Sequence, residues 1–261
     1  IFLIITLVKK IFPGSSGSGN QKNRDRNAII KYANKRLEQN PKDSQAISDL
    51  ANLYYSEEMY DKSLHLLKLL LDQTSSNSSL NEFDIVYKYA VSAMKTGKTD
   101  EAYKYFAYAR SINKDVFEIN YNLGVIEFDR KSYEKAFSLF SAARQLLPDH
   151  TATIQYMGKI LFHMGRFKDA VTYLKKSFEL SPGDKEILYI LGESYNESGQ
   201  SENAYKIFQH LRPDPQYGPA SCLETGKINM KKRNYAKAIE DFEIGLRHKE
   251  IAPNIRLELL Y

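Results

Sequence analysis

Cysteine is almost absent from this chain of 261 residues, which contains one, Cys222. A single thiol excludes an internal disulfide and leaves no second thiol for a cysteine-based zinc or redox site. Cys222 falls on a packing position of an expected helix, which favours a buried small apolar side chain over a nucleophile. Tryptophan is missing, and glycine (13) and proline (8) are sparse. Such a composition favours helices over a turn-rich sheet protein.

Histidines are too scattered to form a metal site. None makes an H-x-x-x-H pair or a cluster with the cysteine; the five are His65, His150, His163, His210 and His248. The Gly/Ser-rich stretch at 14–19 lacks the Lys-Ser/Thr ending of a phosphate-binding loop. We therefore predict no catalytic residues, no metal, no cofactor and no enzymatic activity.

A basic surface for nucleic acid is missing as well. The net charge is +5, but residues 1–36 carry eight Lys and Arg against one Asp. The remaining chain is therefore slightly acidic and lacks a basic face that could follow a phosphate backbone. No nucleic-acid partner is expected.

No apolar run is long enough to cross a membrane, since a spanning helix needs about 20 apolar residues. Residues 1–8 are nevertheless almost wholly apolar, and we interpret 1–12 as the end of an N-terminal membrane anchor that starts earlier. Residues 13–26 read as a flexible basic linker. Positive charge after an anchor favours a single-pass protein with its following domain in the cytoplasm, with the periplasm as the alternative. A signal-peptide remnant or an expression scar stays open for residues 1–12.

What the chain does contain is an internal repeat with a period of 34 residues. Leu123-Gly124, Tyr133, Ala136, Phe140 and Pro148 recur as Met157-Gly158, Phe167, Ala170, Leu174 and Pro182. The frame continues through Leu191-Gly192, Ala204 and Phe208, then Gly226, Tyr235, Ala238 and Phe242. The glycines are expected to let two helices approach closely opposite the alanines, with the large residues filling the gap toward the next unit.

This spacing resembles that of the tetratricopeptide repeat family. The resemblance implies an all-α fold, a right-handed superhelical α-solenoid of tandem helix–turn–helix units, over residues 27–261. We expect a cap helix at 27–40, repeats at 44–82, 83–116, 117–150, 151–184, 185–218 and 219–252, and a partial repeat at 253–261. The proline-rich segment 212–215 is expected to bend or loosen the junction before the last full repeat. An unfinished repeat leaves leucines bare, so self-association through the C-terminal end is also expected.

In this family the first helix of every unit lines a concave groove that holds protein or peptide ligands. The residues that face the groove by this resemblance are Tyr55, Tyr87, Met94, Tyr121, Asn122, Phe128, Gln155, Lys159, Phe162, His163, Tyr189, Glu193, Lys227 and Met230. Phe128 and Phe162 are the favoured anchors, because helix packing does not demand a large ring at their position. The family's clamp for a terminal carboxylate is not matched by any repeat.

The resemblance implies a non-catalytic scaffold or adaptor that is tethered to a membrane and binds partner proteins. It looks like the repeat-bearing adaptors of bacterial envelope or membrane-complex assembly. The alternative is the recruitment arm of a larger enzyme whose catalytic domain lies beyond Tyr261.

Overall fold

The structure is a computed structural model that describes residues 18–260, and within them the chain forms fourteen α-helices and no strand. The predicted all-α array of tandem helix–turn–helix units is confirmed. The helices are α2 (Ser18–Gln39), α3 (Ser44–Ser56), α4 (Tyr60–Leu71), α5 (Glu82–Lys95), α6 (Thr99–Ile112), α7 (Phe117–Asp129), α8 (Tyr133–Leu146), α9 (Thr151–His163), α10 (Phe167–Leu180), α11 (Lys185–Glu197), α12 (Ser201–Leu211), α13 (Gly218–Lys231), α14 (Tyr235–Leu246) and α15 (Pro253–Leu260).

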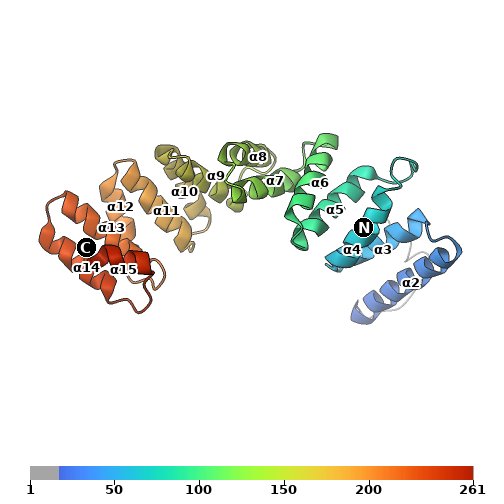
Figure 1. Ribbon diagram of the computed structural model, residues 1–261, viewed down its shortest axis with the longest axis horizontal. Coiled ribbons are helices and arrows are strands. Elements are labelled where there is room, and N and C mark those ends of the chain that lie inside the picture. The colour runs from blue at the N-terminus through green and yellow to red at the C-terminus, as the bar shows by residue number, and fades with distance from the viewer. Residues whose placement is uncertain (1–17, 261) are drawn as a thin grey trace. The chain divides into compact units, whose positions relative to one another are not determined.

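These helices divide between two compact units. Unit 1, Ile1–Lys114, holds the described helices α2 to α6, and unit 2, Asp115–Tyr261, holds α7 to α15. Within unit 2, Figure 1 shows α7 to α14 as successive helix pairs, each joined by a short turn. Each helix also packs against the next along the chain in its unit, so the apolar faces are covered by neighbours in sequence.

First helices of several repeats begin at a side chain that caps the backbone. Asp43 accepts a hydrogen bond from the Ala46 amide at 2.9 Å, and Asp184 accepts one from the Ile187 amide at 3.1 Å. Asn81 and His150 serve the starts of α5 and α9 in the same way. Each cap satisfies one of the backbone donors that a helix start leaves free, which fixes where these first helices begin.

The turn inside each helix pair requires one residue in the left-handed conformation. Glycine supplies it at Gly97, Gly165 and Gly199 (φ +71° to +82°), whereas other residues supply it at Glu58, Lys131 and Arg233 (φ 58° to 60°). Glycine adopts this conformation without a steric penalty. The turn therefore forms in all six repeats. In the three that lack glycine, the left-handed residue has a conformational free-energy cost.

The helix-internal glycines make the close approach that their recurrence predicts, but with a different partner. A Cβ placed on Gly124 would lie 3.0 Å from Phe140 Cζ, and one on Gly158 would lie 2.8 Å from Leu174 Cγ. The expected partner Ala136 is one turn away from Phe140 on the same face of α8. The nearest contact of each glycine is therefore the large side chain, Phe140 or Leu174, and not the alanine.

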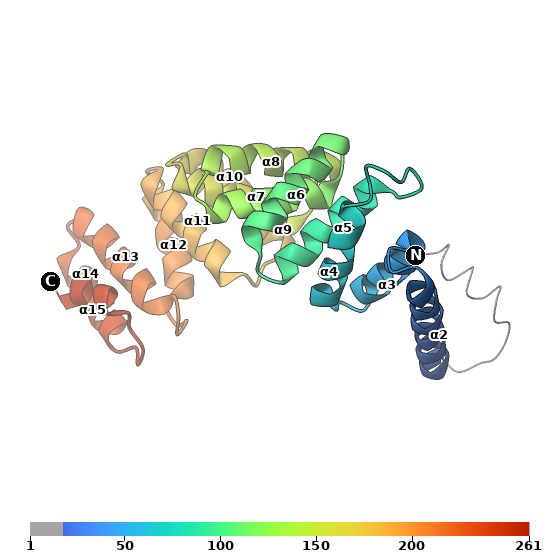
Figure 2. The same ribbon diagram turned by 45° about the vertical axis from the view of Figure 1, so that its right-hand side comes forward.

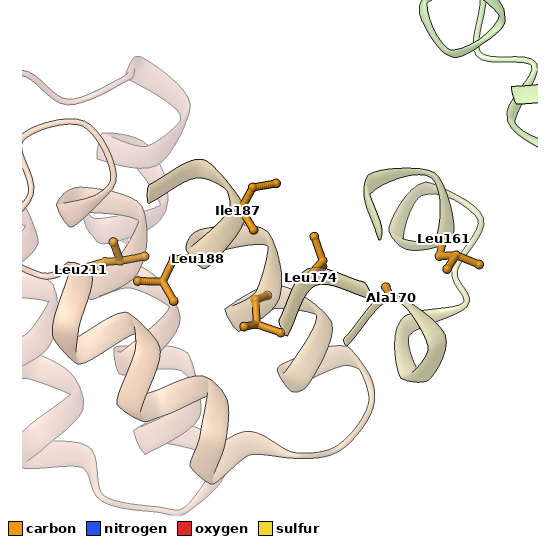
Figure 3. Packing of buried hydrophobic residues seen from close by; sticks show 7 residues of the cluster. Leu161, Ala170, Leu174, Ile187, Leu188 and Leu211 are labelled. Carbon is orange, nitrogen blue, oxygen red and sulfur yellow. The ribbon is translucent and has the colours of Figure 1, made fainter. Parts of the chain in front are cut away.

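The core of unit 2 runs through successive repeats instead of closing around one centre. One cluster consists of Leu161, Ala170, Leu174, Ile187, Leu188, Leu191 and Leu211. Figure 3 shows these side chains between α9, α10, α11 and α12. A residue of one repeat is thus buried by the next repeat, as expected for a repeat array.

Helix α2 covers the first repeat of unit 1, lying beside α3 in Figure 2. Ala33 is buried with Ala46 and Leu50, and Arg26 forms an ion pair with Glu57 at 2.8 Å. The helix starts nine residues before position 27, so the described part of the expected linker, 18–26, is helical and that expectation was wrong. The physical reason is that 20–26 contains no glycine or proline to stop a helix.

Two sequence-based predictions concern the remaining termini. The expected anchor at 1–12 and the first part of the linker, 13–17, lie outside the described residues, as does Tyr261. Between residues 18 and 260, no helix is long and apolar enough to span a membrane.

The proline-containing junction before α13 is held by specific bonds, in contrast to the loosening we expected. Asp214 is buried and accepts hydrogen bonds from the Gln216 and Tyr217 amides at 2.9 and 2.8 Å. Its other carboxylate oxygen accepts from Lys185 at 2.6 Å. Pro215 does not disturb this arrangement, because the donors that Asp214 needs lie on the two residues after it.

Candidate functional site

First helices of neighbouring repeats lie side by side in unit 2. Rings of Phe128 on α7 and Tyr156 on α9 are 5.2 Å apart, and Lys159 on α9 donates to Glu186 on α11 at 2.7 Å. The structure thereby brings most predicted binding residues onto what we call the first-helix face of unit 2. Its members are Tyr121, Asn122, Phe128, Gln155, Lys159, Phe162, His163, Tyr189, Glu193, Lys227 and Met230.

The α7 and α9 part of this face is aromatic. Tyr121 contacts Phe140 and Tyr156 at ring distances of 5.6 and 6.1 Å, and Phe128 contacts His163 at 5.9 Å. All except buried Phe140 and exposed His163 are half-buried, so they offer apolar surface to a ligand while also packing on one another. Partial burial of the ring, followed by the charges of Lys159 and Lys131, lowers the pKa of His163 and so favours its neutral form.

Sequence reasoning missed Tyr156 and Tyr133 in this aromatic group. Tyr133 stacks on His163 with ring centroids 5.1 Å apart and an angle of 7° between the planes. Tyr156 occupies the same place in its repeat as Asn122, which was predicted to face a ligand. The repeat frame could therefore have found Tyr156, whereas Tyr133 lies at the start of a second helix and carried no such signal.

Phe128 and Phe162 both pack against neighbouring side chains. Phe128 contacts three rings, those of Tyr133, Tyr156 and His163, and Phe162 packs against the core cluster and Phe167. The reason is that the following repeat covers one side of each ring. Only the other side remains for a ligand, so replacing either ring would disturb the fold together with binding.

Polar members of the face form hydrogen bonds and ion pairs, most of them from one first helix to the residues at or near the start of the next. Gln155 Nε2 donates to Asp184 at 2.9 Å, and Lys159 Nζ donates to Glu186 at 2.7 Å. On α13, Lys227 pairs with Glu224 at 3.1 Å and with Glu258 of α15 at 2.8 Å. Both lysines are therefore already engaged by carboxylates. Met230, on the same helix as Lys227, is 49% exposed.

Glu193 has the most perturbed carboxyl on this face. Burial, then the neighbouring charges of Glu224 and Glu197, raise its pKa to about 7, and a hydrogen bond from the Tyr189 hydroxyl opposes that rise. The Tyr189 ring lies 5.6 Å from those of both Phe208 and Tyr217. The pKa of Tyr189 is raised as well, first by burial and then by Glu193. Glu193 therefore holds its proton to a higher pH than an ordinary glutamate does.

This raised pKa predicts a pH dependence of stability. An acid with a higher pKa in the folded state stabilises the fold below its ordinary pKa and loses that contribution as the pH rises toward 7. We expect the contribution of Glu193 to the free energy of unfolding to fall by about 1 to 3 kcal/mol between a pH of about 5 and a pH of about 8. Denaturant unfolding at both pH values measures it against Glu193→Gln, which should be the more stable protein at the higher pH. Equal pH dependence in the two proteins would contradict the assignment.

The other three predicted residues, Tyr55, Tyr87 and Met94, lie in unit 1 and form a separate group. Tyr55 contacts Tyr60 at 5.9 Å and lies beneath Lys88, whose Nζ also donates to Asn52 at 2.6 Å. Tyr87 stacks on Phe83, and Met94 is half-buried. The predicted residues thus form two sets, one in each unit.

Chemistry of other kinds finds little support in the part of the chain that the structure describes. No group of three metal-binding side chains occurs between residues 18 and 260. Cys222 is buried, and burial raises the pKa of its thiol, which disfavours a thiolate nucleophile.

The C-terminal helix is partly covered. Leu259 is buried against α14 and would contact a Cβ on Gly245, so this leucine is not bare as we expected. Leu257 and Leu260 are 58% and 63% exposed. Self-association through these two residues stays a prediction.

Comparison with known proteins gives two matches to family models, both described as tetratricopeptide repeat, at residues 115–183 and 161–217. No curated protein matches the chain. Among solved structures, MamA 41-end from Desulfovibrio magneticus RS-1 is 21% identical, with a TM-score of 0.58 over 65% of this chain and 96% of that one. YrrB, described as a TPR protein with an unusual peptide-binding site, is 18% identical, with a TM-score of 0.59 over 77% and 97%.

At these identities the solved structures show a shared fold and nothing more. The family models match the repeats that build most of unit 2, where the glycine and alanine positions recur most regularly. The two matches identify residues 115–217 as tetratricopeptide repeats, and the solved structures show that a larger part of the chain shares this fold.

Proposed function

We propose that this chain is a non-catalytic scaffold that binds a segment of a partner protein across the first-helix face of unit 2. The observation that carries the proposal is the half-buried aromatic group on α7 and α9, which presents rings from two successive repeats on one face. Aromatic side chains supply large contact area at modest ordering cost, as protein interfaces require. The peptide-binding site named for YrrB supports the same use of the fold.

Two finer statements belong to this proposal. A membrane tether at residues 1–12, with the repeats on the cytoplasmic side, would place the scaffold at an envelope or membrane complex. The alternative role, the recruitment arm of a larger enzyme, would use the same face and differ in what the bound partner is brought to. The full-length sequence distinguishes the two roles.

Photo-crosslinking tests which surface binds. A photoreactive amino acid replaces Asn122 or His163 on the first-helix face and, as matched controls, the exposed Ser138 on α8 or Thr172 on α10. We expect a partner protein in cell extract to be crosslinked from positions 122 and 163 and not from 138 and 172. Crosslinks confined to 138 and 172 would move the binding site to the second helices.

A further inference from the structure

The chemistry of the bound segment can be inferred from one joint between repeats, and this inference rests on the proposed function. Where repeat 151–184 meets repeat 185–218, the ninth residue of the first, Lys159, pairs with the second residue of the next, Glu186. At the following joint the same two positions hold Glu193 and Ala220. A carboxyl group therefore lies where the preceding joint has a lysine, and a methyl group lies where its ion-pair partner would be.

The charged side chains around Glu193 do not compensate for this. Lys159 is engaged by Glu186, and Lys227 is engaged by Glu224 and Glu258. Across residues 18–260, no basic side chain forms an ion pair with Glu193, which has the Tyr189 hydroxyl as its neutral partner. A half-buried carboxylate that lacks a cation is costly, and a basic ligand would remove that cost.

The residue types on the first-helix face also change between repeat 151–184 and repeat 185–218. The twelfth residue of successive repeats is Phe128, Phe162 and then Asn196, while the thirteenth changes from His163 to Glu197. The face is therefore aromatic on α7 and α9 and acidic on α11. Two rings, those of Tyr189 and Tyr217, remain close to the acidic part, 5.6 Å apart and inclined at 31°.

We propose that the first-helix face of unit 2 binds an extended peptide segment that carries a large apolar side chain and, further along, a lysine or arginine. The apolar side chain lies against the aromatic part near Phe128 and His163. The cation donates hydrogen bonds to Glu193, beside the half-buried rings of Tyr189 and Tyr217.

The spacing of the two ligand side chains follows from the helices. Packed helices are roughly 8 to 10 Å apart, and an extended chain rises roughly 3.3 Å per residue, so one helix corresponds to about three ligand residues. From α9 or α7 to Glu193 on α11, the basic residue is therefore expected roughly three to six positions from the apolar one. Acidic segments are disfavoured, because Glu193, Glu197 and Glu224 would repel them.

A phage-displayed library of random dodecapeptides tests this inference. It is selected in parallel on the chain, on Glu193→Gln and on Glu179→Gln, which removes the same charge from the exposed surface of α10. The chain and Glu179→Gln should enrich peptides with a large apolar residue and a Lys or Arg at the spacing given above. Glu193→Gln should retain enrichment of the apolar residue and lose that of the basic one.

Affinity of one selected peptide then gives a quantitative result. We expect Glu193→Gln to weaken binding about tenfold and Glu179→Gln less than about twofold. Replacing the basic residue of the peptide by alanine should weaken binding to the chain about tenfold and leave binding to Glu193→Gln unchanged.

Each contrary outcome has a distinct meaning. Selected peptides without a basic residue, or an equal effect of both variants, would refute the inference and leave the proposed function standing. Failure to enrich any peptide that competes with crosslinking from positions 122 and 163 would refute both.

Discussion

Replacing Asp241 by alanine is expected to lower the free energy of unfolding by about 3 to 5 kcal/mol. Asp241 on α14 is 3% exposed, accepts a hydrogen bond from Asn229 Nδ2 at 2.8 Å and forms an ion pair with Arg212. Arg212 follows α12, so the pair joins one repeat to both helices of the next. Removing the anion leaves a guanidinium and a buried amide without their partner, which costs more than the pair itself contributes.

Denaturant unfolding followed by far-ultraviolet circular dichroism measures this loss. The matched control is Arg166→Ala, which breaks an ion pair with Asp169 whose two side chains are each 51% exposed. Exposed pairs contribute about 0 to 1 kcal/mol, so the control should remain close to the unmodified chain. Similar losses in the two variants would show that the pair at Asp241 is not the buried connection described above.

Phe140→Ala should cost a similar amount, about 3 to 5 kcal/mol. The ring is completely buried, lies over Gly124, stacks on Tyr156 with centroids 4.8 Å apart and meets Tyr121 edge-on. Its removal leaves a cavity between two repeats that no neighbouring side chain can fill, because the opposing residue is a glycine.

The chain supplies its own control for this variant. Leucine occupies the equivalent place in the next repeat, as Leu174 above Gly158. Phe140→Leu should therefore lose only roughly 1 to 2 kcal/mol. A thermal or denaturant midpoint that falls as far for leucine as for alanine would mean that ring stacking, rather than filled volume, stabilises this joint.

The fold could be predicted from the sequence because the first helix packs against the second in the same way in each repeat. Gly124, Gly158 and Gly192 mark one contact of the first helix with the second, and a residue that recurs at a fixed interval reports a shared environment. Register, helix type and helix order follow from that recurrence. The identity of the contacting side chain does not, which is why alanine rather than Phe140 was expected over Gly124.

Features that occur once were harder to predict. An aspartate does not recur at the place of Asp214, where the two preceding repeats have Leu180 and Leu146, and the helical start at Ser18 precedes the repeats, so no periodic signal predicted either feature. The candidate site was predictable as a helix face, because facing positions recur too. Which of its side chains also pack on the next repeat, as Phe128 does, depends on the distance between helices and could not be read from one sequence.

Joints between the repeats of unit 2 carry a consequence for how this chain can evolve. Each is linked by its own polar pair, such as Lys176 with Asp149, Lys159 with Glu186 and Lys232 with Glu202. The two members of a pair belong to different repeats, so a repeat moved elsewhere in the array would meet a residue that does not match it. Duplication or loss of one repeat would leave charged side chains without their ion-pair partners at both new boundaries. The repeats share one helix–turn–helix backbone, yet their order is specified by the residues that pair across the joints.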